Sequence, residues 1–403
     1  MQEPLNKRID VIDALRGFTL LGIVIAHMTE QYYAGMHPEQ FDPQKTSSVV
    51  DKVVSVLVGV LITGKFFMIF SFLFGMSFFI QLNNAKGDPG FLVKFSWRLI
   101  LLFGIGFIHH LHYRGDILTI YAMLGVVLLL TYRLPDNYLL WIGLLLVIDV
   151  PGILVRIIKL STGDTGINDF IRQDQTELLQ YYQTFKSGEY IDLLKENLAS
   201  FKTKMIYQVW SGRLYITAGL FVLGLYAGRK KFFENISAKL PLLRRLVRLS
   251  AWTLLGVIIV GLAFFAAGNG LVPGGLSQDV NIAAGLSFSD ILNACLAVLY
   301  VAWFMMLFQK DKWNKRLMKF YEAGRMGLTT YIMQSFFGLL IFSTIGLGML
   351  DDFGASISFL IAIVIFIVQI VISKFWLQHF NYGPIEWIWR CFTNLKWVPL
   401  IRK

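Results

Sequence analysis

The chain has 403 residues, of which 56% are hydrophobic and only 16% are charged, and its formal net charge is +11. Its mean hydropathy of +0.59 is well above the usual value for a soluble domain. Apolar runs long enough to cross a bilayer recur along the whole chain, so we expect an all-α protein with many transmembrane helices. These values exclude a large water-soluble core.

The cysteine content and the short motifs exclude several kinds of site. The two cysteines, Cys295 and Cys391, are far apart in the chain, so they predict neither a disulfide framework nor a cysteine-based metal site. The sequence also lacks a P-loop, a dinucleotide-binding glycine motif, a zinc-protease motif and a serine-hydrolase motif. We therefore expect no metal cofactor.

Ten apolar segments are predicted to cross the membrane. The first follows Lys7 and Arg8 and has no small-residue cleavage site after it, so we expect it to be retained as a helix. The segment 50–63 is expected to be an interfacial or re-entrant lead-in to the second span. The predicted spans are 11–28, 64–82, 91–110, 116–132, 138–157, 207–228, 249–267, 291–309, 326–348 and 355–376.

The charges of the loops predict the orientation of this bundle. With the N-terminus inside, loop 229–248 carries seven basic residues against one acidic residue, and loop 310–325 carries six against two. The corresponding outer loops, 268–290 and 349–354, carry four Asp and no Lys or Arg. By the positive-inside rule we expect both termini to be cytoplasmic, in a multi-pass protein of the plasma membrane.

The excess of positive charge is then explained by topology. Its natural partner is the anionic lipid of the inner leaflet, and no nucleic-acid partner is expected. A cytoplasmic binding site for a polyanionic ligand would also explain part of the charge.

One sizeable extramembrane segment, 158–206, separates two predicted five-helix halves, 1–157 and 207–403. Its polar character and its spacing of Leu, Tyr and Phe predict two short amphipathic helices over the outer face, acting either as a lid or as a passive connector. In IDVPGIL (148–154), the Pro and Gly predict a break in the fifth helix. Asp149 beside them is an intramembrane acid of the kind that usually faces a cavity.

The stretch ALRGFTLLGIVIAH (14–27) places Arg16 and His27 on one helix. At about 100° per residue, positions eleven apart return to within roughly 20° of the same face, separated by roughly 16 Å along the axis. Because either side chain would be costly facing lipid, we expect both to face the bundle interior or a wet cavity. Asp13 and Glu30 extend this polar stripe, and Glu30 is placed to orient the imidazole.

An alternative is that Arg16 extends to the inner interface and His27 marks the outer one. Against this, the spacing recurs in the third span, where Arg98 and His109 are again eleven residues apart. Two helices of the same direction then carry the same pair. This favours a polar path from inner arginines to an outer cluster of histidines.

The R-x10-H pattern on the first helix resembles the signature of membrane acyltransferases of the acyltransferase-3 type and of the heparan-glucosamine acetyltransferase group. Nearly the whole chain is similar to a narrower branch, the YeiB-like proteins with a C-terminal DUF418 domain. The matching segments are IDALRGFTLLGIVIAH (12–27), GKFFMIFSFLFGMSF (64–78), the Arg-to-His helix with RGDILTIYAMLG (114–125), GRMGLTTYIMQS (324–335) and FNYGPIEWIWR (380–390).

The resemblance implies a mechanism in which acyl-CoA or acetyl-CoA, held from the cytoplasm, delivers its acyl group through the bundle to an outer acceptor. That acceptor would be a small molecule, a lipid or a glycan. The resemblance makes His27 the catalytic base and Arg16 the residue that supports the donor. The heparan-type relatives instead have Asn at the position of His27 and a catalytic His further on, where this chain has His37. We prefer His27, because the spacing directs it into the bundle.

The residue types suit this chemistry. Acyl transfer needs a base that titrates near the working pH, with cations or N–H groups around the developing oxyanion. The inner candidates for binding the phosphates of the donor are Arg16, Arg98, Arg325 and Arg390. The candidates for binding the acceptor or the reacting group are Lys65, His109, His110, Arg114, Asp116, Asp149 and Arg213.

Two other functions stay open at this point. A transporter or flippase would use the same polar stripe as a permeation or proton path, although the sequence has no convincing inverted repeat. A non-enzymatic membrane factor would use the charges only to stabilise its bundle. Assembly into a homo-oligomer is left open as well.

Overall fold

The computed structural model describes residues 9–41, 47–162, 175–268 and 278–402. Every regular element in these ranges is a helix, apart from one isolated bridge between Phe380 and Ile401. In chain order the elements are α1 (Asp10–Thr29), η1 (Glu39–Phe41), α3 (Val49–Leu61), α4 (Phe66–Asn84), α5 (Phe91–His112), α6 (Leu118–Thr131), α7 (Asp136–Val147), α8 (Val150–Thr162), α10 (Gln175–Ser187), α11 (Tyr190–Trp210), α12 (Arg213–Arg229), α13 (Ile236–Gly268), α14 (Gln278–Phe308), α15 (Asp311–Leu317), η2 (Met318–Phe320), α16 (Tyr321–Arg325), α17 (Gly327–Phe342), α18 (Ala355–His379) and α19 (Pro384–Asn394).

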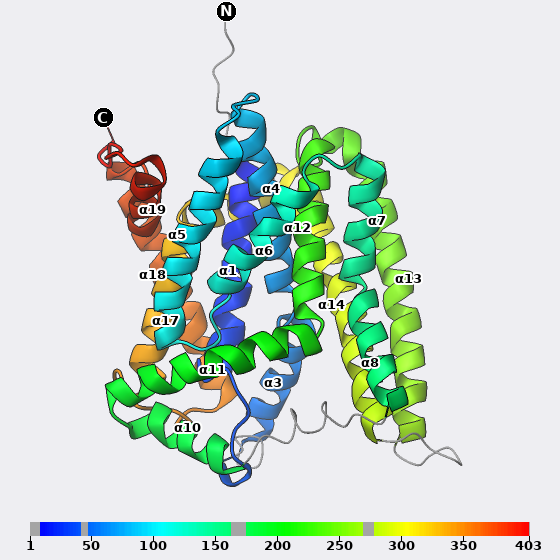
Figure 1. Ribbon diagram of the computed structural model, residues 1–403, viewed down its shortest axis with the longest axis vertical. Coiled ribbons are helices and arrows are strands. Elements are labelled where there is room, and N and C mark those ends of the chain that lie inside the picture. The colour runs from blue at the N-terminus through cyan, green and yellow to red at the C-terminus, as the bar shows by residue number, and fades with distance from the viewer. Residues whose placement is uncertain (1–8, 42–46, 163–174, 269–277, 403) are drawn as a thin grey trace, which may run out of the picture.

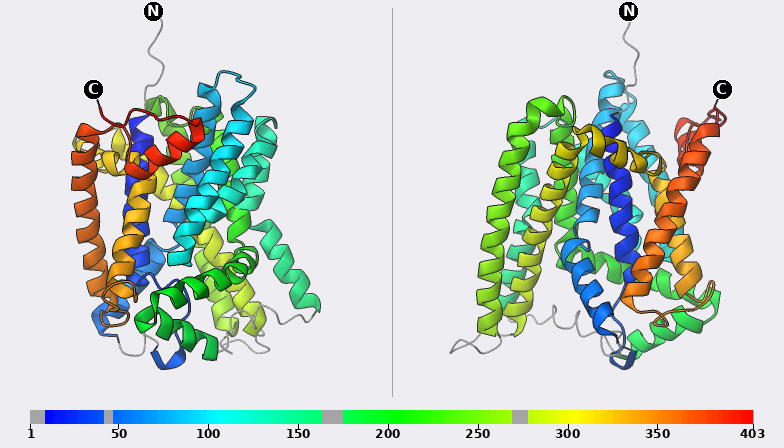
Figure 2. Two further views of the ribbon diagram at one scale, coloured as in Figure 1. Left: turned by 60° about the vertical axis from the view of Figure 1, so that its left-hand side comes forward. Right: turned by 180° about the vertical axis from the view of Figure 1, so that it is seen from behind.

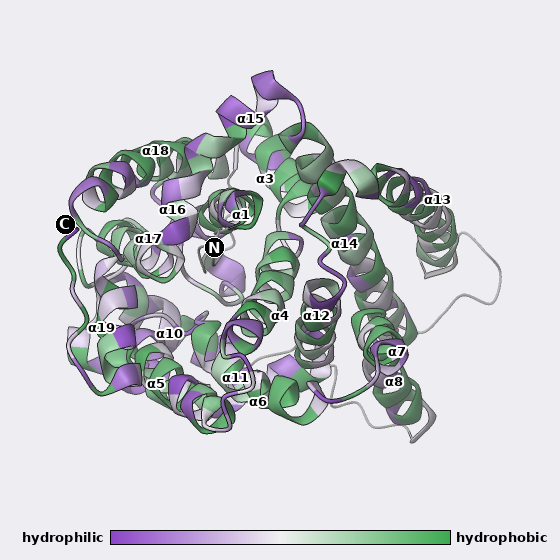
Figure 3. Ribbon diagram, turned by 90° about the horizontal axis from the view of Figure 1, so that it is seen from above, coloured by the Kyte–Doolittle hydropathy of each residue, from purple (hydrophilic) through white to green (hydrophobic). Residues whose placement is uncertain are grey.

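Several of these helices are long and apolar enough to cross a membrane. Within the described ranges there are six, or up to eight if each of two bent pairs, α7 with α8 and α11 with α12, is one span. Two shorter apolar helices, α6 and α17, accompany them. Hydrophobic residues dominate the ribbon along outer helices such as α14 and α18 (Figure 3). The chain is therefore a helical membrane protein, as its composition predicts.

The helices form a bundle with two different ends. At one end, which we call the terminal end, α1 begins and α19 lies beside the start of α5 (Figure 1). At the opposite end, which we call the capped end, α10 and α11 lie across the bundle (Figure 2). The long helices α13 and α14 pack side by side at one edge.

The first helix, α1, is the most buried of the candidate spans. Small residues allow its neighbours to approach closely. A Cβ added at Gly17 would lie 1.9 Å from the Phe320 carbonyl oxygen, and one added at Gly22 would lie 2.1 Å from the Phe66 ring. Glycine is thus required at both positions, and α1 is held in the centre of the bundle with Arg16 and His27 surrounded by protein.

The predicted segments agree with the helices, but some boundaries differ. The break at 148–154 is present as a bend of 43° between α7 and α8. The described part of 158–206 contains the short helix α10 and most of α11, which is longer than predicted and continues to Trp210. In contrast, α13 and α14 each begin thirteen residues before the predicted spans, at Ile236 and Gln278. Hydropathy marks the apolar part of a helix, whereas the helix itself continues into polar sequence. Lys7 and Arg8, which precede the first predicted span, lie outside the described residues.

Candidate functional site

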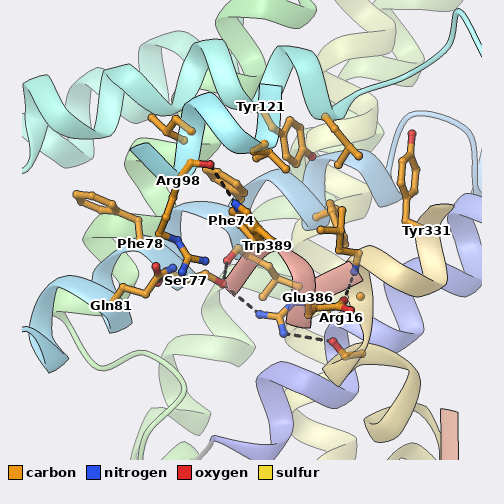
Figure 4. A pocket seen from close by; sticks show the side chains of 18 of the residues that line it. Arg16, Phe74, Ser77, Phe78, Gln81, Arg98, Tyr121, Tyr331, Glu386 and Trp389 are labelled. Atoms are coloured by element: carbon orange, nitrogen blue, oxygen red, sulfur yellow. Dashed lines mark hydrogen bonds between the residues drawn. The ribbon is translucent and has the colours of Figure 1, made fainter. Parts of the chain in front are cut away.

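The candidate site consists of two cavities in the described part of the bundle, one toward the terminal end and one toward the capped end. The first, which we call the arginine cavity, has a volume of about 230 Å³ and lies toward the terminal end. Its mouth is polar, with Arg16, Arg98 and Arg325 in its lining, and its wall is made of apolar side chains from α4, α5 and α6. Arg98 and Gln81 lie on one side of it and Tyr331 on the other (Figure 4). Three of the four predicted inner arginines therefore meet in one place.

Arg16 joins three helices at this mouth. Its Nη1 donates to Asp13 Oδ1 at 2.6 Å and to the Gly324 carbonyl at 3.3 Å, and its Nη2 donates to Ser77 Oγ at 3.1 Å (Figure 4). Asp13, which the sequence places on the same polar stripe, is thus an ion-pair partner of Arg16. The guanidinium uses both terminal nitrogens in different directions, which a single ammonium does not reproduce.

Arg98 has a guanidinium with unused donor capacity. Its Cζ lies 4.2 Å from the centre of the Trp389 ring, and the Trp389 Nε1 donates to the Arg98 carbonyl at 3.1 Å. The Arg98 Nε is buried and has no hydrogen-bond partner among the described residues. A buried guanidinium donor of this kind suits an anionic ligand.

The other two inner arginines are placed differently. Arg325 lines the cavity, and its Nη2 donates to the Asn381 carbonyl at 3.5 Å. Arg390 lies outside the cavity, with its Cζ 4.4 Å from the centre of the Tyr382 ring. The structure therefore does not bring Arg390 to the predicted donor site, because its position on α19 turns it toward Tyr382.

Glu386 contributes a carboxylate to the same cavity, and its hydrogen-bond partners among the described residues belong to the start of α17. Its Oε1 accepts hydrogen bonds from the backbone N–H groups of Leu328 at 2.7 Å and Thr329 at 3.0 Å, and Oε2 accepts from the Thr329 hydroxyl. It therefore caps the first turn of α17. Burial raises the pKa of Glu386 above its ordinary value, against the opposing effect of these hydrogen bonds.

The second cavity, which we call the histidine cavity, has a volume of about 120 Å³ and lies toward the capped end. It forms where three breaks between helices converge: the α3–α4 turn, the α5–α6 loop and the 68° bend between α11 and α12. The side chains with charge or acid–base chemistry in its lining are His27, Glu30, Asp116 and Arg213. The R-x10-H spacing thus places Arg16 and His27 in different cavities along one helix.

His27 is surrounded by tyrosines. Its ring centre lies 5.2 Å from that of Tyr32, 5.5 Å from that of Tyr113 and 6.5 Å from that of Tyr331. Its Nδ1 is buried and makes no hydrogen bond to any described residue. The expected orientation of the imidazole by Glu30 is therefore wrong for this geometry: both residues line the cavity, but no hydrogen bond joins them.

The carboxylate–imidazole pair is made instead by Asp116 and His109. The His109 Nδ1 lies 2.7 Å from Asp116 Oδ1, and the His109 Nε2 is buried without a described partner. Asp116 also accepts from the Thr119 N–H at 2.9 Å and lies 3.5 Å from the Lys204 ammonium. A carboxylate that holds Nδ1–H leaves Nε2 as the free acceptor. His109 lies behind Asp116 rather than in the cavity lining, so the expectation that it shares the cavity with His27 is only approximate.

Lys204 is a site residue that the sequence did not reveal. It comes from α11, and its ammonium donates to Thr119 Oγ1 at 3.0 Å and lies 3.3 Å from His110 Nδ1. Lys204 is 88 positions from Asp116 in the chain, and no local pattern connects them. The predicted residue His110 is fully buried between this lysine and Phe201, outside both cavities.

Lys65 and Arg114 bind backbone near the capped end. The Lys65 ammonium donates to the carbonyls of Gly59 and Thr63, both at 2.8 Å, and so closes the end of α3. The Arg114 Nε donates to the Ala34 carbonyl at 3.0 Å, and its Cζ lies 3.5 Å from the Tyr181 ring centre. Both side chains lie outside the two cavities, in contrast to the predicted role in acceptor binding.

Asp149 and His37 also lie elsewhere. Asp149, in the break between α7 and α8, is fully buried, with its Oδ2 2.8 Å from the Arg156 guanidinium, which also lies 3.5 Å from Asp290. The sequence predicts that Asp149 faces a cavity, but it lines neither of the two cavities described here. Its carboxylate is instead paired with the buried Arg156 guanidinium. The His37 Nε2 lies 3.5 Å from Asp351 Oδ1 at the capped end, outside the histidine cavity.

The two cavities share part of their walls. Phe70, Tyr121 and Tyr331 line both of them. The Tyr121 hydroxyl lies 2.6 Å from Ser71 Oγ, which fixes the position of that ring. These three aromatic side chains therefore form part of the wall between the arginine cavity, which Arg16 lines, and the histidine cavity, which His27 lines.

Comparison with known proteins places the chain among relatives without an assigned activity. Residues 227–396 match the family described as "Protein of unknown function (DUF418)". "Uncharacterized protein YxaH" of Bacillus subtilis is 28% identical over 99% of this chain and 97% of its own length. "Uncharacterized 39.9 kDa protein in amylase 3'region" of Bacillus acidopullulyticus is 26% identical over the same shares. "Uncharacterized protein YeiB" of Escherichia coli is 36% identical over 20% of each chain. No solved structure gives a significant match.

Proposed function

We propose that this chain, a YeiB-like membrane protein with a C-terminal DUF418 domain, is an acyltransferase that moves an acyl group from cytoplasmic acyl-CoA or acetyl-CoA to an acceptor on the outer side. The observation that carries the proposal is the pair of cavities, one toward the terminal end of the bundle and one toward the capped end, which share an aromatic wall. The arginine cavity offers cations for the donor, and the histidine cavity offers a base for the acceptor.

The proposal includes an orientation. The proposal counts the six long spans, the two bent pairs and the two shorter apolar helices as ten crossings. The basic loops 229–248 and 310–325 join helices at the terminal end, so the positive-inside rule assigns that end to the cytoplasm and the capped end to the outside of the plasma membrane. The arginine cavity then opens on the side where acyl-CoA is made.

The size of the arginine cavity limits what enters it. A cavity of about 150 Å³ is filled by the six carbons of benzene, so this one takes roughly nine non-hydrogen atoms. It suits the thioester end of the donor rather than the whole molecule, whose charged nucleotide would stay at the mouth. There Arg16, Arg98 and Arg325 supply the guanidinium groups that phosphates bind.

The reaction needs few groups. The acceptor X–H attacks the thioester carbonyl carbon, an X–C bond forms and the C–S bond breaks. His27 takes the proton from X–H, and the CoA thiolate takes a proton as it leaves. His109 is paired with Asp116, which lines the histidine cavity. His109 therefore acts either by positioning Asp116 or as a second acid–base group beside the cavity.

A release assay tests the proposal. Purified protein is incubated with acyl-CoA in a bacterial lipid extract, and free CoA thiol is measured with time. We expect release by the unaltered protein, and a loss of about 10²–10⁴-fold in His27→Ala, because a positioned general base contributes that much. His379→Ala changes an exposed histidine at the far end of α18 and should leave the rate unchanged. Absence of release by the unaltered protein, together with uptake of intact solute, would favour the transporter alternative.

A further inference from the structure

The histidine cavity has two side chains of opposite charge in its lining, Glu30 and Arg213. They attract each other across the cavity, but no hydrogen bond or ion pair joins them in the described structure. We propose that the acceptor is amphoteric: an amine that carries a carboxylate or phosphate a few bonds away, bound with its anion on Arg213 and its amine on Glu30. This inference rests on the proposed acyl transfer only for its last step, since binding itself needs no donor.

Arg213 is held in place by backbone geometry and aromatic rings. It begins α12 directly after Gly212, whose φ of +75° is in the left-handed region that glycine favours. Its Cζ lies 5.4 Å from the Tyr207 ring centre and 5.5 Å from the Phe67 ring centre. Between these rings, Arg213 lines the histidine cavity. A planar fork of this kind fits a carboxylate or phosphate with two parallel hydrogen bonds.

Glu30 provides the opposite charge. It follows α1 as its C-terminal cap residue, three positions after His27, so its carboxylate reaches the same cavity as the proposed base. Unlike the other acid in the lining, Asp116, it has no hydrogen bond to its side chain from a described residue. Glu30 as a residue is also exposed at the surface of the described structure. A carboxylate in that place attracts an ammonium group and repels an anion.

The volume supports a compact ligand or a compact head of a larger one. By the benzene comparison, about 120 Å³ takes roughly five non-hydrogen atoms, which is the size of a small amino acid without a long side chain. Neutral polar residues of the lining, among them Thr63, Gln208 and Thr217, add hydrogen-bonding groups without adding charge. The rest of a longer acceptor would project past Glu30.

This arrangement gives a consistent reaction. The ammonium gives one proton to solvent by way of Glu30, and the resulting amine attacks the thioester carbon. The N–C bond forms, the C–S bond breaks, His27 takes the second proton, and the CoA thiolate is protonated as it leaves. The products are an N-acylated acceptor and free CoA.

Direct binding without acyl-CoA tests the assignment. Purified protein is titrated by calorimetry with alanine and with phosphoethanolamine, which carry both charges, and with ethanolamine and propionate, which carry one each. We expect each amphoteric ligand to bind at least about tenfold more tightly than either single-charge ligand. Nanodiscs with phosphatidylethanolamine, compared with phosphatidylglycerol, identify whether the source of the amphoteric group is a lipid head or a free molecule.

Matched variants separate the two contacts. Arg213→Gln should remove the advantage of the anion and Glu30→Gln the advantage of the amine, whereas Arg133→Gln and Glu177→Gln, at exposed positions, should change neither. If Arg213→Gln does not fold, Arg213→Lys keeps the charge and should retain only part of the advantage. Equal binding of one-charge and two-charge ligands, or unchanged binding in both cavity variants, would overturn the inference. If the inference is overturned but the protein still releases CoA in the assay above, the proposed function stands without this acceptor. If amphoteric ligands bind as expected but no CoA is released, the binding site stands and the proposed function fails.

Discussion

At the scale of single residues, the two histidines that share the eleven-residue spacing have different surroundings. His27 lines the histidine cavity with an unpaired Nδ1, whereas His109 is held by Asp116 behind the cavity wall. The spacing predicts that both side chains point into the bundle, but of the two only His27 lines the cavity. It does not predict their partners, because Asp116 lies in a loop and Lys204 comes from a distant helix.

Arg16 offers a residue-scale prediction. Arg16→Lys should reduce CoA release by about tenfold or more, since one ammonium does not replace a fork that contacts both Ser77 and the Gly324 carbonyl. The midpoint of thermal unfolding in detergent should change by only a few degrees, because the charge and the contact with Asp13 remain. Arg133→Lys, at an exposed position just after α6, serves as the control. Full activity of Arg16→Lys would mean that Arg16 only anchors the helix.

At the scale of elements, α1 depends on close contact with its neighbours. Gly17 faces the Phe320 carbonyl, and Gly324 faces the Asp13 carbonyl, where an added Cβ would lie 1.8 Å away. These two contacts fix α16 against α1 and so place Arg325 beside Arg16. Which helices meet at these glycines is seen only in the structure.

This contact makes a stability prediction. Gly17→Ala should lower the free energy of unfolding by about 1–3 kcal/mol, because the new methyl group forces α1 and η2 apart. Gly104→Ala on α5, where nothing lies within 4 Å of the added Cβ, should raise it by about 0.5–1 kcal/mol through better helix propensity. Thermal or denaturant unfolding in detergent measures both. If both substitutions have the same effect, the packing described for α1 is wrong.

At the scale of the whole molecule, hydropathy and loop charge predict a helical membrane bundle, and the structure agrees with that class. They do not predict the cavities, which depend on contacts between segments far apart in the chain. The arginine cavity combines Arg16, Arg98 and Ser77 from the N-terminal half with Arg325 and Trp389 from the C-terminal half. Both halves are thus needed for one site. Hydrophobic pattern alone carries no information on such pairings.

The central claim is that an acyl group crosses the bundle while CoA does not. The most direct measurement uses sealed vesicles of bacterial lipid that contain the protein and small amines, with acyl-CoA labelled in its acyl group added outside. In the molecules whose terminal end faces outward, we predict that free CoA accumulates outside, while the label becomes bound to an acceptor in the lumen or inner leaflet, and that His27→Ala vesicles do neither. Label that enters as intact acyl-CoA, or that is transferred only to acceptors on the side of addition, would contradict the account.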